Sequence, residues 1–175
     1  MKKLILSFCV IVSVIVASSC ATTYGRDKEK VLTAYMESKH LKYYIRPGKM
    51  SAEGSDSGSY VMIDFSYQMD KRNYVSNAYT NFTLYSRLDA FIDAAYFLFS
   101  DNEKVMLSEI STLDRNTGKG YIRVSTVLEQ HNIEKVLKAL ERADCSLKII
   151  LENGVSLSFI ATEDLRIRIR EAFTK

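Results

Sequence analysis

The feature that most constrains this chain is the recurrence of apolar residues at every second position in several segments. From Tyr60 onward, the apolar side chains occupy every second position: Val61, Ile63, Phe65, Tyr67 and Met69. Residues two positions apart in a strand point to the same face, so this pattern predicts strands with one buried face. The chain is therefore expected to be built mainly on an antiparallel sheet.

The clearest hairpin signal is the dipeptide Asn153-Gly154. Apolar residues alternate before and after it: Leu147, Ile149, Leu151, Val155, Leu157 and Phe159. Asn-Gly favours a type I′ turn, in which both central residues have positive φ. We therefore expect a two-stranded hairpin closed by a type I′ turn.

Other strands and turns follow from the same kind of pattern. Further strands are expected through Tyr79 and Phe82, over 90–99, through Val105, Leu107 and Glu109, and over 121–127. The run 90–99 is almost wholly apolar, which predicts a strand buried on both faces. Pro47 is expected to open a Gly- and Ser-rich loop that extends to Ser59.

Three helices are expected from apolar residues at helical spacing. The first covers 27–39, with Val31 and Leu32 on its apolar face, and the second follows Asn132 as its cap. The third begins after Thr162, although the alternation at 165–169 also fits a strand.

These elements predict an α+β fold. We expect about seven strands in a sandwich-like or highly twisted sheet, with an N-terminal helix and two later helices that flank the hairpin. The expected organisation is a signal peptide (1–19), a lipidated tether (20–30), a membrane-proximal helix and loop (31–58) and one α+β domain (59–175). The order of elements over 91–175 resembles that of small exported domains of the invasion-associated locus B type, and this likeness implies no functional residue.

The N-terminus has the parts of a secretory signal. Lys2 and Lys3 precede an apolar run, 4–16, and a patch of small residues, 17–19. As a helix the run covers only ~20 Å, against ~30 Å for the hydrocarbon core of a bilayer. Cleavage after residue 19 is therefore expected, and an uncleaved anchor is the alternative.

The segment that ends in Cys20 resembles the lipobox of bacterial lipoproteins, with Ala17 where that family usually has Leu. The resemblance implies that fatty acyl chains such as palmitate are attached to Cys20. Two or three acyl chains make a stable membrane anchor. The expected location is the cell membrane or outer membrane, with the domain facing the periplasm or the exterior.

Cysteine content and charge exclude some alternatives. Cys9 belongs to the signal and Cys20 to the anchor, so Cys145 alone cannot form an internal disulfide. We expect Cys145 to be a buried small hydrophobe, with a reactive thiol as the alternative. Without Lys2 and Lys3, the 24 basic residues fall to 22 against 21 acidic ones, which argues against nucleic acid as a partner.

No motif predicts catalytic, metal or cofactor residues. The segment 54–58 has Asp56 where a nucleophile elbow needs Ser, and the segment 118–120 lacks the Walker pattern. His40 and His131 are the only histidines and lack ligand spacing. We therefore expect no cofactor and no metal.

One basic and aromatic stretch is a candidate interaction surface. It consists of His40, Lys42, Tyr43, Tyr44, Arg46 and Lys49. Such residues suit anionic head groups or a wall polymer, although a solvated helix exit would have the same composition. The sequence thus favours a lipid-anchored cell-envelope protein with a non-catalytic binding or accessory role towards an envelope protein, wall polymer or apolar ligand. The alternative is an exported hydrolase whose site is assembled only in space.

Overall fold

A computed structural model describes residues 30–35, 40–54, 58–71 and 73–174. The segment Val31–Lys175 forms one compact unit, separate from Met1–Lys30. The expected signal peptide, Cys20 and the tether up to residue 29 lie outside the described residues. Among the described residues, no helix is long and apolar enough to cross a membrane.

The described residues form a single antiparallel sheet of eleven strands, so the expected number of about seven strands, in a sandwich-like or highly twisted sheet, is wrong. The strands are β1 (Val31–Tyr35), β2 (Leu41–Ala52), β3 (Tyr60–Asp70), β4 (Asn73–Tyr74), β5 (Ala78–Tyr85), β6 (Ile92–Phe99), β7 (Lys104–Met106), β8 (Ser108–Asn116), β9 (Tyr121–Leu128), β10 (Cys145–Leu151) and β11 (Ser156–Ala161). The helices are α2 (Ile133–Arg142), preceded by a 3₁₀ turn (Gln130–Asn132), and α3 (Glu163–Thr174). The broader prediction of an α+β fold, mainly antiparallel sheet, is confirmed.

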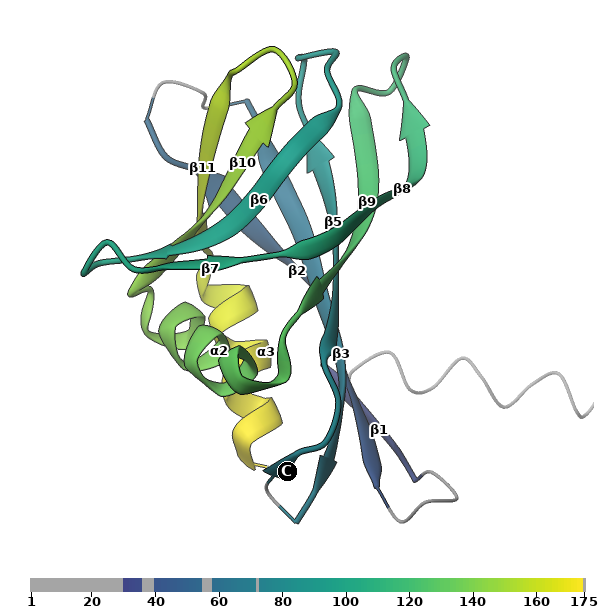
Figure 1. Cartoon of the computed structure of the whole chain (residues 1–175), viewed down its shortest axis with the longest axis vertical. Helices are drawn as coiled ribbons and strands as arrows, with labels where there is room; N and C mark the ends of the chain where they lie inside the picture. Colours follow the sequence, from purple (N-terminus) through teal and green to yellow (C-terminus); the bar gives the residue numbers. More distant parts are fainter. Residues whose placement is uncertain (1–29, 36–39, 55–57, 72, 175) are drawn as a thin grey trace, which may run out of the picture. The chain divides into compact units, whose positions relative to one another are not determined.

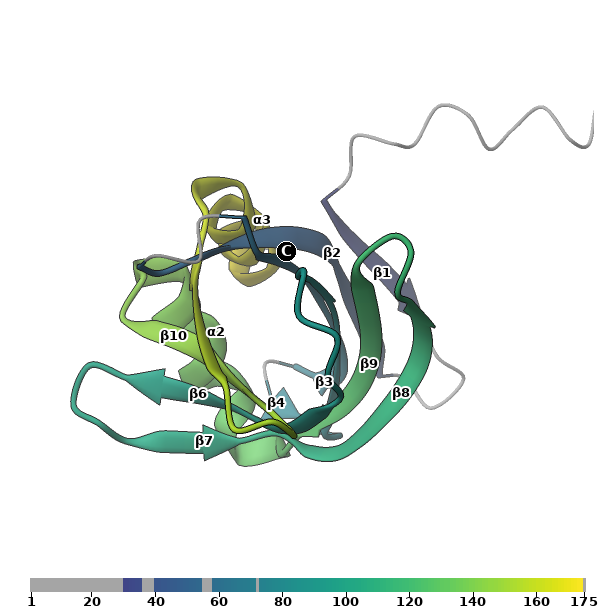
Figure 2. The same ribbon diagram turned by 90° about the horizontal axis from the view of Figure 1, so that it is seen from above.

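The sheet curls because one segment of chain joins its two ends. Its main strand order is β7-β6-β10-β11-β2-β3-β5-β9-β8, and β1 and β4 pair with β2 and β3 beside this path. Only Leu107 separates β7 from β8, although these strands stand at opposite ends of the order. The Leu107 amide donates a hydrogen bond to the carbonyl oxygen of Ala95 at 3.0 Å. The segment 104–116 therefore pairs first with β6 and then with β9, and Figure 2 shows the resulting curl.

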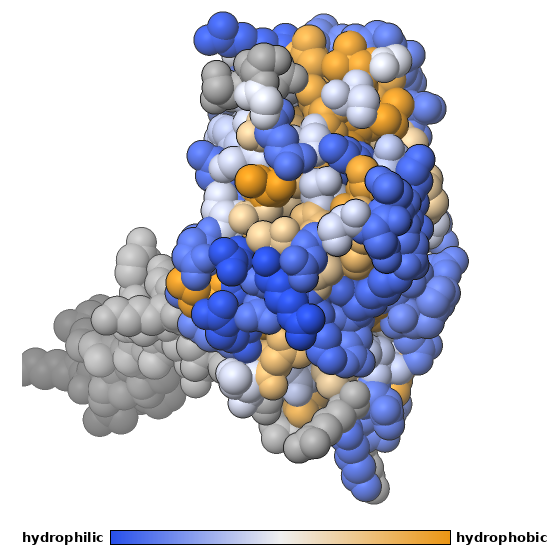
Figure 3. Space-filling view, turned by 90° about the vertical axis from the view of Figure 1, so that its left-hand side faces the viewer, coloured by the Kyte–Doolittle hydropathy of each residue, from blue (hydrophilic) through white to orange (hydrophobic). Residues whose placement is uncertain are grey.

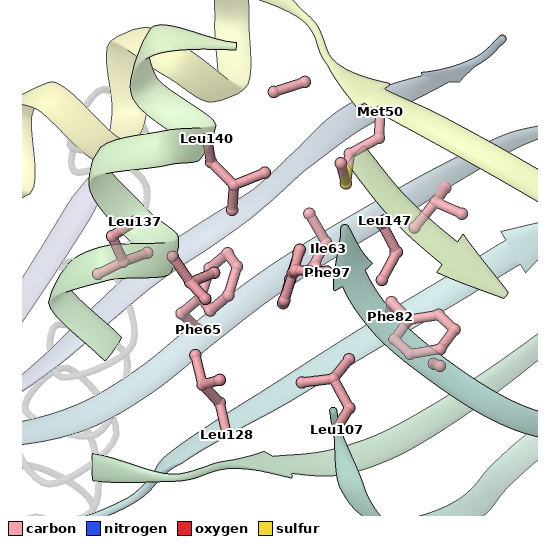
Figure 4. Close-up of a cluster of buried hydrophobic side chains, with 14 of the residues drawn as sticks. Met50, Ile63, Phe65, Phe82, Phe97, Leu107, Leu128, Leu137, Leu140 and Leu147 are labelled. Atoms are coloured by element: carbon pink, nitrogen blue, oxygen red, sulfur yellow. The ribbon is translucent and has the colours of Figure 1, made fainter. Parts of the chain in front are cut away.

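The core fills the inside of the curled sheet. Alternate residues of the strands point inward, as the period-two pattern predicts, and helix α2 adds Leu137 and Leu140 from one end (Figure 4). The four phenylalanines Phe65, Phe82, Phe97 and Phe159 are at most 1% exposed. Each such side chain contributes roughly 1.5–3 kcal/mol by leaving water. The interior is thus a packed core.

Strand β2 changes partners at a bulge. Its first half pairs with β1 and its last residues pair with β11, with a shift in register between Ile45 and Gly48. Helix α3 packs against β2 here, and a Cβ atom on Gly48 would lie only 2.7 Å from Leu165 Cδ1. Pro47 therefore lies within β2, at the bulge, and does not open the expected loop. This position suits proline because the local ladder is already interrupted.

The expected helix over 27–39 is wrong where the chain is described, because Val31–Tyr35 is strand β1. Its five residues pair with β2, from Val31 opposite Ile45 to Tyr35 opposite Leu41. Hydrogen bonding along the edge of β2 thus outweighs helical spacing in so short a segment. Strands β1 and β2 consequently belong to the same sheet as the later strands, and the described residues of 31–58 contain no helix.

The C-terminal hairpin is confirmed, but the type I′ turn is wrong. Of the two turn residues, only Gly154 has positive φ, at 80°. The Gly154 amide donates to the carbonyl of Leu151 at 2.8 Å, and the Leu151 amide donates to the carbonyl of Val155 at 2.9 Å. This is a three-residue loop in which a turn is followed by a left-handed glycine. Asn153 instead accepts a hydrogen bond at Oδ1 from the Val155 amide, at 3.1 Å.

Strand β6, the residue before α2 and the last helix were each expected from the sequence, with different outcomes. Strand β6 is fully buried on one face only, because Ala94, Tyr96 and Leu98 on its other face are half-buried. Asn132 precedes α2 but makes no side-chain capping bond, since its own backbone is already helical. The segment 163–174 is helical, as expected, and places Leu165 and Ile169 in the core.

The side of the domain that carries β10 and β11 differs in polarity along its length. Figure 3 shows apolar residues gathered at the upper end and a belt of polar residues below them. The exposed apolar side chains of this hairpin are those of Val155 and Ile160. Lower down, an ion pair joins the two helices, between Arg170 Nε and Glu141 Oε1 at 2.9 Å.

Candidate functional site

A row of three tyrosines crosses the outer face of the sheet at the end opposite α2. Tyr60, Tyr85 and Tyr121 are register partners on the adjacent strands β3, β5 and β9. Their neighbours Val61, Leu84 and Ile122 point into the core, which directs the tyrosines outward. Strand β9 starts at Tyr121 and leads towards α2, so the row lies at the upper end of β3, β5 and β9 in Figure 1.

The rings of this tyrosine row contact one another: Tyr60 and Tyr85 are stacked, and Tyr121 is tilted against Tyr85. The centroids of Tyr60 and Tyr85 are 4.4 Å apart with an interplanar angle of 10°, and those of Tyr85 and Tyr121 are 5.8 Å apart at 49°. Lys49 Nζ lies 4.8 Å from the Tyr60 centroid. Tyr85 thus has a ring neighbour on each side in the row, and Tyr60 has a ring and an ammonium group as neighbours; all three tyrosines remain half-buried.

A cavity of about 560 Å³ lies beside the tyrosine row, and we call it the end pocket. It is formed where the β5–β6 connection meets the β8–β9 turn. Its lining residues are Gly58, Tyr60, Leu84, Tyr85, Ser86, Arg87, Leu88, Asp89, Ala90, Arg115, Thr117, Gly118, Lys119, Gly120, Tyr121 and Ile122. The two turns are held together by the Ser86 amide, which donates to the carbonyl of Gly120 at 2.9 Å.

The charged side chains of the end pocket are mostly basic. Arg115 forms an ion pair with Asp89, and its guanidinium carbon lies 4.1 Å from the centroid of the Phe91 ring. Arg87 and Lys119 are exposed on the two connections that form the rim. One acidic and three basic groups therefore line a half-open cavity, which suits a ligand that carries negative charge.

Tyr121 links the tyrosine row to the neighbouring strand β8. Its hydroxyl donates to Asp114 Oδ2 at 2.7 Å. This hydrogen bond to a carboxylate raises the pKa of Tyr121, because the bond exists only while the phenol is protonated. The Tyr121 hydroxyl is therefore held in one orientation at the rim of the end pocket.

Further along the outer face, Asp64 is a buried carboxylate. Only 5% of its side chain is exposed; Asn81 Nδ2 donates to its Oδ1 at 2.8 Å, and Arg123 Nη2 lies 3.9 Å from its Oδ2. Burial raises the pKa of Asp64, while Asn81 and Arg123 oppose that shift. Burial also raises the pKa of Tyr44, with Asp64 adding to the effect. A polar cluster therefore extends across β2, β3, β5 and β9.

The structure divides the interaction surface that the sequence suggests. Lys42, Tyr44 and Arg46 occupy alternate positions of β2, and Lys49 follows the bulge. Tyr43 between them is buried and stacks on Tyr67, with centroids 5.4 Å apart and an interplanar angle of 6°. Tyr43 cannot belong to an exposed surface because the period of a strand turns it inward. His40 directly precedes β2 and is half-buried.

Burial raises the pKa of one group in the core, Cys145, and of one group packed against the core, Tyr74. Burial raises the pKa of Cys145 to about 12, so this thiol stays protonated at neutral pH. Burial likewise raises the pKa of Tyr74, which packs against Tyr67, to about 12. Both groups are therefore uncharged at neutral pH.

The sequence analysis missed the residues of the end pocket. Tyr85 and Tyr121 are 36 positions apart in sequence and become neighbours only through the pairing of β5 with β9. Among the described residues, no group of three or more His, Cys, Asp or Glu could hold a metal ion. Comparison of the chain with models of protein families, with curated proteins and with solved structures found no match. The assignment of the candidate site therefore rests on its geometry.

Proposed function

We propose that this chain is a lipid-anchored cell-envelope protein that binds a wall polymer in the end pocket without catalysing a reaction. The signal-like N-terminus and the lipobox-like segment at Cys20 support the anchor. The observation that carries the binding role is the tyrosine row beside a cavity of about 560 Å³ with a basic rim. Tyrosine offers both apolar contact area and a hydroxyl at low entropic cost.

The packing of the domain favours a polar polymer over an apolar ligand. An apolar ligand inside the sheet would have to displace side chains such as Phe65, Phe82 and Phe97, which are at most 1% exposed. The end pocket instead offers phenol hydroxyls together with the cations of Arg87 and Lys119. Peptidoglycan presents sugar hydroxyls and peptide carboxylates, and these groups complement the side chains of the end pocket.

The proposal is tested by sedimentation with insoluble peptidoglycan sacculi. Replacing Tyr85 with Ala removes the central ring of the row, so binding should weaken about tenfold or more, as for a residue central to an interface. The matched control is Tyr79→Ala on the same strand. Tyr79 is 60% exposed and lies outside the end pocket. The control should bind sacculi as the unmodified protein does.

Two results would count against this function. Equal loss of binding in both variants would mean that tyrosine exposure in general, and not the end pocket, causes adsorption to the sacculi. Unchanged binding by a folded Tyr85→Ala protein would exclude the tyrosine row from the binding site.

A further inference from the structure

We propose that a second surface, on the outer face of β2 and its neighbours, docks on anionic lipid head groups of the membrane. This surface, the docking face, consists of Lys42, Tyr44, Arg46, Lys49, Tyr79 and Arg123. None of these residues lines the end pocket, although Lys49 also lies over the ring of Tyr60, which does. The inference goes beyond polymer binding and rests on the proposed function only for the lipid anchor that holds the domain at the membrane.

Strand register brings the residues of the docking face together. Tyr44 pairs with Ser66, and Ser66 pairs with Tyr79, so the two tyrosines lie in one row across β2, β3 and β5. Lys49 and Arg123 lie in another row, through Met62 and Thr83. Neighbouring strands are ~4.8 Å apart, so each row brings its side chains onto one continuous patch.

The docking face is positively charged. It carries four basic residues, of which Lys42, Lys49 and Arg123 are exposed. Carboxylates occupy two outward positions on β3, Asp64 and Asp70, and Asp64 is buried beneath its neighbours. On the adjacent strand β8, Asp114 is the register partner of Arg123 and accepts the hydrogen bond from Tyr121. Basic side chains attract anionic lipid head groups, and tyrosines are favoured at the membrane interface.

In sequence, the proposed anchor precedes strand β1, which flanks β2 in the sheet. Strand β1 flanks β2, with Leu32 opposite Tyr44 and Val31 opposite Ile45. Eleven residues lead from Cys20 to Val31, and at ~3.3 Å each they extend at most ~36 Å. A lipid on Cys20 would therefore tether the start of β1 within this distance of the bilayer, which favours the membrane over other anionic partners.

The test is co-sedimentation of the chain from Ala21 onward, which contains the whole compact unit Val31–Lys175, with lipid vesicles. Vesicles of equal parts phosphatidylglycerol and phosphatidylcholine are compared with pure phosphatidylcholine. Binding should require phosphatidylglycerol and fall as sodium chloride rises. The triple variant K42Q/R46Q/K49Q should lose at least about tenfold in vesicle binding, since each basic residue near the surface adds to the attraction.

The matched control is K135Q/K138Q/R142Q, which removes three basic residues from α2 instead. Figure 1 shows α2 on the left of the lower part of β2 and β3, with β1 on their right. Arg123 is left unchanged in both proteins because it lies 3.9 Å from the buried Asp64. The control should bind vesicles like the parent chain, and thermal melts should show that both variants fold.

The outcomes separate this inference from the proposed function. Two results would contradict the docking face. One is an equal loss of vesicle binding in both triple variants, and the other is vesicle binding that does not depend on salt concentration or on lipid charge. If K42Q/R46Q/K49Q loses sacculus binding while its vesicle binding is unchanged, these residues bind the wall polymer, and the proposal that they dock on lipid is wrong. If Tyr85→Ala leaves sacculus binding unchanged while K42Q/R46Q/K49Q loses vesicle binding, the end-pocket proposal is wrong and the docking face is supported.

Discussion

At the scale of the residue, Gly154 shows how one backbone conformation closes the C-terminal hairpin. Its φ of 80° lies in the left-handed region, where an L side chain is strained. No atom lies within 4 Å of the place that its Cβ would occupy. Substitution at this position therefore tests backbone conformation without a steric clash.

We expect Gly154→Ala to lower the free energy of unfolding by about 1–2 kcal/mol, the cost of the left-handed region for a residue with a Cβ. The measurement is urea denaturation of the chain from Ala21 onward. Gly58→Ala is the matched control, because Gly58 also has open space but no positive φ, and its change should stay within about 0.5 kcal/mol. Equal stability of the two variants would contradict the left-handed turn.

At the scale of the element, the contact between β2 and α3 depends on the absence of a side chain at Gly48. A Cβ there would lie 2.9 Å from Leu165 Cβ and 3.1 Å from Leu165 Cα. The second of these is a backbone atom, so rotation of the Leu165 side chain cannot relieve the overlap. Glycine therefore permits α3 to lie against β2 at the bulge.

Gly48→Ala should destabilise the domain by about 1–3 kcal/mol, as overpacking does in a well-packed core. Combining it with Leu165→Ala tests the contact, since the smaller side chain removes the overlap at Cδ1 but leaves those at Cβ and Cα. A double-mutant cycle by urea denaturation should therefore show partial coupling. Strict additivity of the two substitutions would mean that β2 and α3 do not touch here.

At the scale of the whole molecule, the closure of the sheet and the proposed anchor determine which surfaces of the domain are available to a ligand and to the membrane. The segment 104–116 joins the two ends of the strand order, which protects strand edges that would otherwise pair with other chains. The end pocket lies at one end of this curled sheet, and the two helices fill the other. The proposed ligand and membrane contacts therefore lie on neighbouring parts of one sheet, which meet where Lys49 lies over the Tyr60 ring.

Cys20→Ala should abolish incorporation of labelled fatty acid into the protein in bacterial cells, because this residue is the proposed site of acylation. Cys9→Ala is the matched control, since it removes a cysteine from the same N-terminal segment and should leave labelling unchanged. Gel fluorography of both variants is the measurement. Labelled Cys20→Ala protein would contradict the lipobox interpretation.

Local patterns predicted the elements whose side-chain period matches their burial. The alternation in β3, β10 and β11 and the apolar face of α2 were enough to identify these elements, because each buries one side against the core. The sequence also contained the single cysteine of the domain, which excludes an internal disulfide. These properties depend on neighbours in the chain and needed no knowledge of the fold.

Only the tertiary structure decided the partners of each strand and the surfaces that they build. Strand β1 was mistaken for a helix because its five residues gain their hydrogen bonds from β2, a pairing that no local pattern records. Tyr43 and Tyr44 are adjacent in sequence, yet the strand turns one into the core and the other outward. Tyr60, Tyr85 and Tyr121 form a row through cross-strand register alone. Strand register places residues that are distant in sequence opposite one another, and this is why the candidate site could not be predicted from the sequence.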